Sequence, residues 1–206
     1  MSLDALTAAI AAMSAWELLA VVFGVAYLLL AVRESLWCWY AAFAGTAISL
    51  YLFWEAGLLM ESALQIYYLA MAAYGWWQWQ QNRGTHTDTS TNSVLPICRW
   101  TWQQHGIALS GVLLLSAVSG TFLAQHTNAI MPYLDSFTTW GSILTTWMVT
   151  RKVLENWLYW LVIDGVSVYL YMDHGLYLFA LLFIVYLFIV VIGFQQWLQH
   201  YRLINS

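Results

Sequence analysis

Seven apolar stretches follow one another along the chain, and polar segments separate them. They cover about residues 16–32, 36–54, 58–80, 104–124, 136–150, 153–171 and 175–198. A helix needs roughly 20 apolar residues to cross a hydrocarbon core of about 30 Å. The pattern therefore predicts an all-α integral membrane protein with seven transmembrane helices, and the fifth of these stretches is the shortest.

The composition agrees with a membrane environment. Hydrophobic residues make up 62% of the chain and charged residues only 8%, whereas a soluble domain carries about 25% charged residues. Nothing basic or glycine-rich indicates binding of nucleic acid or phosphate. Cys38 and Cys98 form no CxxC pair, so the sequence predicts neither a disulfide framework nor a metal or cofactor site.

The basic residues indicate an orientation in the membrane. There are six of them, and each follows an odd-numbered apolar stretch: Arg33, Arg83, Arg99, Arg151, Lys152 and Arg202. Seven spans would place all six on the same side of the bilayer. Because cytoplasmic loops carry the excess of Lys and Arg, we expect the N-terminus outside and the C-terminus in the cytoplasm.

An internal repeat becomes visible when the sequence is shifted by 118 residues. "YLFWEAGL" (51–58) then lies on "YLYMDHGL" (169–176), and 15 of the 47 positions from 33 to 79 are identical. The sequence thus predicts one transmembrane domain over 1–206, built as 3+1+3. One repeat covers about 16–80, a linking helix about 104–124 and the second repeat about 136–198. Because the linking helix reverses the chain once more, the two repeats are parallel, in a SWEET-like arrangement.

Polar residues within the apolar stretches are the candidates for a binding site. Seven of them recur at helical spacing on the third and sixth stretches: Glu61, Gln65, Tyr68, Asn156, Trp157, Trp160 and Asp164. Ionisable residues inside a span commonly mark a substrate or ion pathway, and a desolvated indole face attracts cations. Indoles beside carboxylates therefore predict a flat, positively charged ligand, with Asp164 opposite its charge.

Packing interpretations stay open for several of these residues. Trp157 is close in sequence to Arg151 and Lys152, so it also fits the aromatic belt at a membrane interface. A protonated Asp164 would donate one hydrogen bond between helices, and Gln65 would bridge two helices. Glu155 is one turn after Arg151, so we expect an interfacial ion pair between these two.

At these residues the chain resembles the Pnu vitamin transporters. The run "TRKVLENWLYW" (150–160) followed by Asp164, the run "YGWWQW" (74–79) and the 3+1+3 repeat carry the resemblance, which spans nearly the whole chain. It implies a bacterial inner-membrane protein, not an enzyme, that facilitates diffusion of an unphosphorylated vitamin. It also implies that a cytoplasmic kinase traps the cargo, and it leaves a homo-oligomer open.

The branches of that family differ in cargo. The nicotinamide riboside branch carries asparagines at the positions of Ala72 and Ile192, and often an asparagine at the position of Asp164. The chain therefore most resembles a thiamine-transporting PnuT-type member, with a nicotinamide riboside transporter as the alternative. On this hypothesis the cargo enters past Glu61, stacks on Trp157 and Trp160 and is neutralised by Asp164. Gln65, Asn156 and Tyr68 then add polar contacts.

Three other functional classes compete with this interpretation. An intramembrane enzyme has only His105 and His126 to offer, in the fourth stretch or at its edge, without an HExxH motif. A structural or sensory membrane protein would use the aromatic residues for packing alone. A proton-coupled transporter would use Asp164 or Glu61 as its proton carrier.

Overall fold

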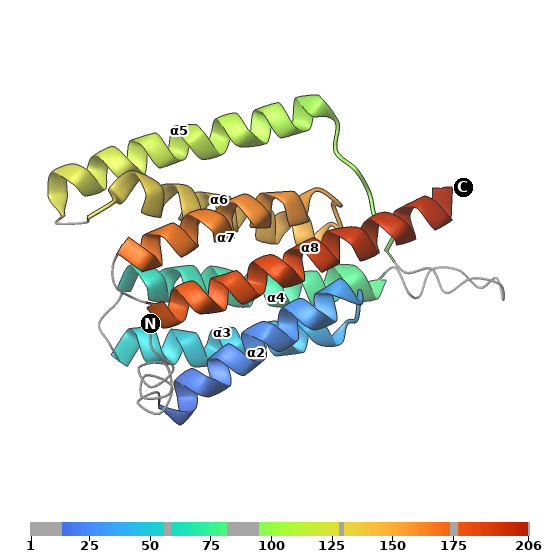
Figure 1. Cartoon of the computed structure of the whole chain (residues 1–206), viewed down its shortest axis with the longest axis horizontal. Helices are drawn as coiled ribbons and strands as arrows, with labels where there is room; N and C mark the ends of the chain where they lie inside the picture. Colours follow the sequence, from blue (N-terminus) through green and yellow to red (C-terminus); the bar gives the residue numbers. More distant parts are fainter. Residues whose placement is uncertain (1–13, 56–58, 82–94, 128–129, 174–176, 206) are drawn as a thin grey trace. The chain divides into compact units, whose positions relative to one another are not determined.

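The computed structural model describes residues 14–55, 59–81, 95–127, 130–173 and 177–205 (Figure 1). The helices of these ranges are α2 (Ala15–Val32), α3 (Trp37–Glu55), α4 (Leu59–Gln81), α5 (Trp102–His126), α6 (Pro132–Thr150), α7 (Asn156–Asp173) and α8 (Tyr177–Asn205). The seven predicted helices are thereby confirmed, with bounds that shift by a few residues. The largest shift is at the end of α8.

Local sequence signals explain where several helices begin. Ser14 caps α2 in a reciprocal arrangement with Glu17, and Thr101 caps α5 in the same way with Gln104. Pro132 occupies the first turn of α6, where its missing N–H is not needed. The predicted fifth stretch began at about residue 136, whereas α6 begins at Pro132. The first turn of α6 is polar, so hydropathy did not include it in an apolar span.

The chain divides into two compact units, Met1–Pro96 and Ile97–Ser206. In the first unit α3 packs against α2 and α4; in the second, α5 packs on α6, α6 on α7, and α7 on α8. The predicted linking helix, α5, thus belongs with the second unit. Within the described ranges, Ala15–Val32, Trp102–His126 and Phe179–Asn205 are long and apolar enough to cross a membrane, by length and composition.

Each unit contains a tryptophan that lies directly against a glycine of the next helix. A Cβ atom on Gly75 would lie 2.4 Å from the ring of Trp39, and one on Gly193 would lie 2.7 Å from the ring of Trp157. Trp39 also meets Trp79 edge-on, with ring centroids 5.2 Å apart, and Trp157 meets Trp197 in the same way at 5.4 Å. These residues are 118 positions apart in each case, so the two units pack one helix pair alike.

The turn after α2 and the turn after α6 also have the same conformation. Glu34 and Lys152 both have positive φ, 52° and 50°. The N–H of Glu34 donates to the carbonyl of Ala31 and that of Ser35 to Leu30, and the bonds of Lys152 and Val153 match them at the shifted positions. This is the Schellman ending, in which a residue in the left-handed region closes the helix. Non-glycine residues adopt that region at a cost in free energy. The chain nevertheless forms this turn twice.

Hydroxyl groups within the helices bond to their own helix. Thr145 donates to the carbonyl of Gly141 at 2.7 Å, Ser119 to that of Leu115 at 2.7 Å, and Ser167 to that of Ile163 at 2.9 Å. A polar group that faces hydrocarbon needs a partner inside the protein, and this bond to the preceding turn supplies one. The threonine-rich α6 is therefore compatible with a lipid environment.

We expect Gly193→Ala to destabilise the protein. The added methyl group would overlap the buried Trp157 ring, and overpacking of this kind costs about 1–3 kcal/mol. Thermal unfolding of the detergent-purified protein, followed by tryptophan fluorescence, measures the effect. Gly165→Ala in α7 is the matched control, because a Cβ there meets nothing within 4 Å. Equal melting temperatures for the two variants would contradict the role of this contact.

Candidate functional site

Helix α7 carries three of the buried polar residues of the second unit, while those of α6 are all serines and threonines. Asn156, Asp164 and Ser167 are all buried, with Asp164 only 3% exposed. They are spaced at eight and three residues, so they lie toward one side of the helix. Trp160, half-buried, falls on the same side. Asn156, Trp160, Asp164 and Ser167 thus form a polar stripe along one side of α7.

Two polar atoms at the start of this stripe have no hydrogen-bond partner. The Nδ2 of Asn156 donates to the Val153 carbonyl at 2.7 Å, but its Oδ1 is buried and unpaired within the described structure. The indole Nε1 of Trp157 is likewise buried and unpaired there. An unsatisfied buried polar group costs about 1–3 kcal/mol, so each one calls for an explanation.

Asp164 lies halfway along α7. Among the residues that the structure describes, no hydrogen bond or ion pair reaches its carboxyl group, although it is near enough to Tyr186 of α8 to interact electrostatically. A carboxyl group within a span is expensive, about 2.5–3.5 kcal/mol at a helix centre on insertion scales. Its presence without a fixed partner therefore favours a functional role over a packing role.

The other predicted site residues have different surroundings. Trp157 is fully packed between Gly193 and Trp197, and Trp39 has the same packing in the first unit, including an unpaired Nε1. Gln65 and Tyr68 are half-buried on α4 of the first unit. Glu61 is in the first turn of α4, and its side chain lies outside the described residues.

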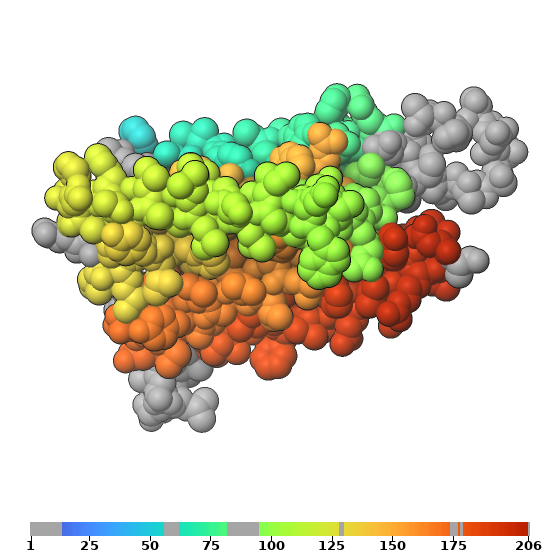
Figure 2. All heavy atoms as spheres, turned by 90° about the horizontal axis from the view of Figure 1, so that it is seen from above, coloured from blue at the N-terminus to red at the C-terminus, as the bar shows by residue number. Residues whose placement is uncertain are grey.

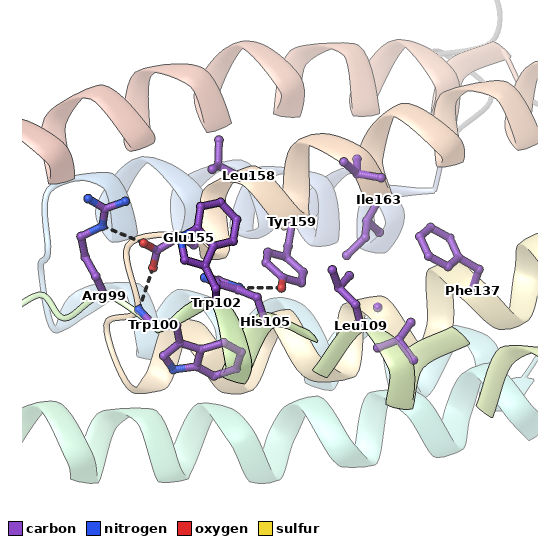
Figure 3. Close-up of a pocket in the computed structure, with 13 residues that line it drawn as sticks. Arg99, Trp100, Trp102, His105, Leu109, Phe137, Glu155, Leu158, Tyr159 and Ile163 are labelled. Atoms are coloured by element: carbon purple, nitrogen blue, oxygen red, sulfur yellow. Dashed lines mark hydrogen bonds and ion pairs between the residues drawn. The ribbon is translucent and has the colours of Figure 1, made fainter. Parts of the chain in front are cut away.

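The second unit also contains an open cavity of about 680 Å³ (Figure 3). It is lined by Arg99, Trp100, Trp102, His105, Leu109, Val112, Phe137, Gly141, Glu155, Leu158, Tyr159, Val162 and Ile163. Most of the α7 side of the lining lies roughly opposite the polar stripe, given 3.6 residues per helical turn: residues 155, 158, 159 and 162. None of the predicted site residues lines this cavity, and hydropathy analysis gave no signal for it.

One end of the cavity is polar. The Nε of Arg99 donates to the Glu155 carboxylate at 2.8 Å, and the backbone N–H of Trp100 donates to the other carboxylate oxygen at 3.3 Å (Figure 3). The sequence-based pairing of Glu155 with Arg151 is therefore wrong. Arg151 instead lies over the ring of Trp147 at 5.7 Å. Glu155 turns towards the segment before α5 because that segment is attached to the α6–α7 turn.

A short backbone pairing makes this attachment. The N–H of Cys98 donates to the carbonyl of Lys152 at 3.0 Å, and that of Leu154 donates to the carbonyl of Cys98 at 2.8 Å. A little further along, the Nδ1 of His105 and the hydroxyl of Tyr159 are 2.8 Å apart, which connects α5 to α7. The end of the polar 81–99 loop is thus part of the fold of the second unit.

The environment of Cys98 predicts slow thiol alkylation. Partial burial raises the pKa of the Cys98 thiol, and the nearby Glu155 carboxylate raises it further. The thiolate is the reactive species, so at pH 8 iodoacetamide should react more slowly than with a free cysteine. In a Cys38→Ser background, Glu155→Gln should shift the rate profile to lower pH, whereas Asp173→Asn should not. An unchanged profile for Glu155→Gln would contradict the electrostatic contribution.

Comparison with known proteins gives consistent matches. The family model described as nicotinamide mononucleotide transporter matches residues 14–199. The riboflavin/roseoflavin transporter RibM of Streptomyces davaonensis is 29% identical over 178 residues, covering 85% of this chain and 81% of RibM. The nicotinamide riboside transporter PnuC of Escherichia coli is 27% identical over 176 residues, covering 73% of this chain and 71% of PnuC.

A solved structure shares the fold. The crystal structure of the vitamin B3 transporter PnuC aligns with a TM-score of 0.71 at 18% sequence identity, covering 89% of this chain and 80% of that one. The all-helical architecture thus matches that of a known membrane transporter.

Proposed function

Because the chain belongs to the nicotinamide mononucleotide transporter family, we propose that it carries an unphosphorylated vitamin with a flat aromatic ring across the membrane. It is a multi-pass membrane protein and a vitamin transporter of this family, whose relatives include RibM and PnuC. The observation that carries the proposal on cargo is the buried stripe of α7, where no residue that the structure describes forms a hydrogen bond or ion pair with Asp164.

The chemistry of this stripe favours a cargo that is both cationic and able to form hydrogen bonds. Asp164 supplies a negative charge, and the unpaired Oδ1 of Asn156 supplies an acceptor. Trp160, on the same side of α7, supplies an indole face for stacking. Trp157 is packed in the same way as Trp39, so we assign it to the support of the stripe. Gln65, Tyr68 and Glu61 stay candidates for contacts from α4.

Thiamine remains the cargo that we propose first, because it is a flat cation with few hydroxyl groups. Ala72 and Ile192, the two positions that pointed to thiamine, do not support it equally. Ala72 is buried, whereas Ile192 is 49% exposed on α8, so of the two only Ala72 is a buried position. Riboflavin and nicotinamide riboside are the alternatives, because RibM and PnuC are named for them.

The transport cycle that we propose is facilitated diffusion, with phosphorylation of the cargo by a cytoplasmic kinase. The matched turns at Glu34 and Lys152 and the matched Trp–Gly contacts support two parallel repeats. Two similar bundles that move against each other are a common basis for alternating access. The N-terminus would lie outside and the C-terminus inside, with the basic residues on the cytoplasmic side.

A binding experiment tests the cargo. Purified protein is titrated with thiamine, nicotinamide riboside and riboflavin while tryptophan fluorescence is recorded. We expect thiamine to bind most tightly, and Asp164→Asn to weaken it at least about tenfold, as expected for loss of a hydrogen bond to a charged group. Asp173→Asn, at the exposed end of the same helix, should bind like the wild type.

Each other outcome has a distinct meaning. Tight binding of riboflavin that Asp164→Asn leaves unchanged would refute the charge argument while preserving transport. Preference for nicotinamide riboside would show that Ala72 does not select against the riboside. Binding of none of the three would refute the proposed cargo class.

A flux experiment tests the mechanism. In proteoliposomes without ATP or an ion gradient, labelled cargo should equilibrate to equal concentrations inside and outside. Purified thiamine kinase and ATP enclosed in the vesicles should then drive accumulation of the phosphorylated product, if thiamine is the cargo. Accumulation of free cargo that follows an imposed pH gradient would instead indicate proton coupling, with Asp164 or Glu61 as the carrier.

A further inference from the structure

The cavity of the second unit opens on a surface of that unit that includes exposed apolar side chains. Leu109 on α5 and Leu158 and Val162 on α7 are apolar residues of its lining that are each about half exposed. Figure 2 shows the side chains of α5 along this face, next to those of α6 and α7. In a multi-pass membrane protein the surroundings of such helices are hydrocarbon, so the apolar part of this cavity is open to acyl chains.

The length of the cavity fits one leaflet. Along α5 its lining runs from Trp102 to Val112 and along α7 it ends at Ile163, and ten residues of helix extend about 15 Å. The hydrocarbon core of a bilayer is about 30 Å thick, so one leaflet is about 15 Å. The groove therefore begins where the helices begin and reaches about the middle of the membrane.

The end of the groove at the start of α5 has the groups that recognise a lipid phosphate. Arg99 is 55% exposed, and its Nε contacts Glu155, while its terminal amino groups make no hydrogen bond within the described residues. Trp102 is strongly exposed at the first turn of α5, where a tryptophan suits the membrane interface. A guanidinium is well suited to phosphate oxygens.

The charge at this end favours an anionic lipid. Arg151 lies over the ring of Trp147, and that ring packs against Trp100 of the groove at 5.8 Å. Arg99 and Arg151 thus both lie near the polar end. The helix dipole of α5, which begins here, adds partial positive charge.

We propose that this groove binds an anionic glycerophospholipid from the surrounding leaflet. One acyl chain lies between α5 and α7 over Phe137 and Gly141 of α6, and the phosphate lies at Arg99. The bound lipid joins three helices that the His105–Tyr159 contact and the Arg99–Glu155 ion pair already connect. Leu158 and Val162 lie on the other face of α7 from the polar stripe, and none of the proposed cargo residues lines the groove.

Native mass spectrometry of the protein in mild detergent, with phosphatidylglycerol or phosphatidylcholine added, tests this site. We expect the wild type to retain one phosphatidylglycerol more tightly than phosphatidylcholine. Val162→Trp fills the groove, and should lower the affinity for both lipids at least about tenfold, since burial of a few methylene groups contributes that much. Val118→Trp, at a similarly exposed valine of α5 outside the groove, is the matched control and should bind lipid normally.

A charge variant tests the headgroup. Arg99→Gln should remove the preference for phosphatidylglycerol, whereas Arg202→Gln, at the end of α8 outside the groove, should keep it. Unchanged lipid retention in Val162→Trp would overturn the proposal. So would a change in oligomeric mass with Val162→Trp at constant lipid retention, because a second copy of the chain would then be the occupant. Val162 is exposed, so its replacement tests the groove even if Arg99→Gln fails to fold.

Discussion

Each unit depends on a close contact between a tryptophan of one helix and a glycine of the next. Trp39 lies on Gly75 and Trp157 on Gly193, at distances that leave no space for even a methyl group. Within a bilayer the hydrophobic effect does not drive helices together, and close packing at small residues takes its place. The large indole surface supplies the contact area, and the glycine allows the helix axes to approach.

The two units share the Trp–Gly packing, but they differ at the turns that follow α2 and α6. In the second unit, the backbone of Cys98 pairs with that of the α6–α7 turn, and Arg99 binds Glu155. The position that corresponds to Glu155 in the first unit is Trp37, which is 67% exposed. The segment before α5 is therefore attached to the α6–α7 turn through Cys98 and Arg99.

Helix α7 has two faces with different chemistry. One face carries Asn156, Trp160 and Asp164, where unpaired polar groups suit a polar cargo. The other carries Leu158 and Val162, where an apolar groove ends in an arginine. This division allows a membrane helix to contact cargo on one side and lipid on the other, because successive residues of a helix point 100° apart. It also explains why the candidate residues do not line the cavity of the second unit.

The sequence by itself determined the seven helices, the repeated Trp and Gly positions and the polar stripe of α7, because hydropathy, residue spacing and internal similarity are all read along the chain. It did not determine the partner of Glu155, which is Arg99, 56 positions earlier, and not the neighbouring Arg151. Nor did it show the cavity, whose lining comes from the loop and three helices. Contacts between distant segments leave no local pattern, so only the tertiary structure decided which charges pair and which apolar surfaces form a groove.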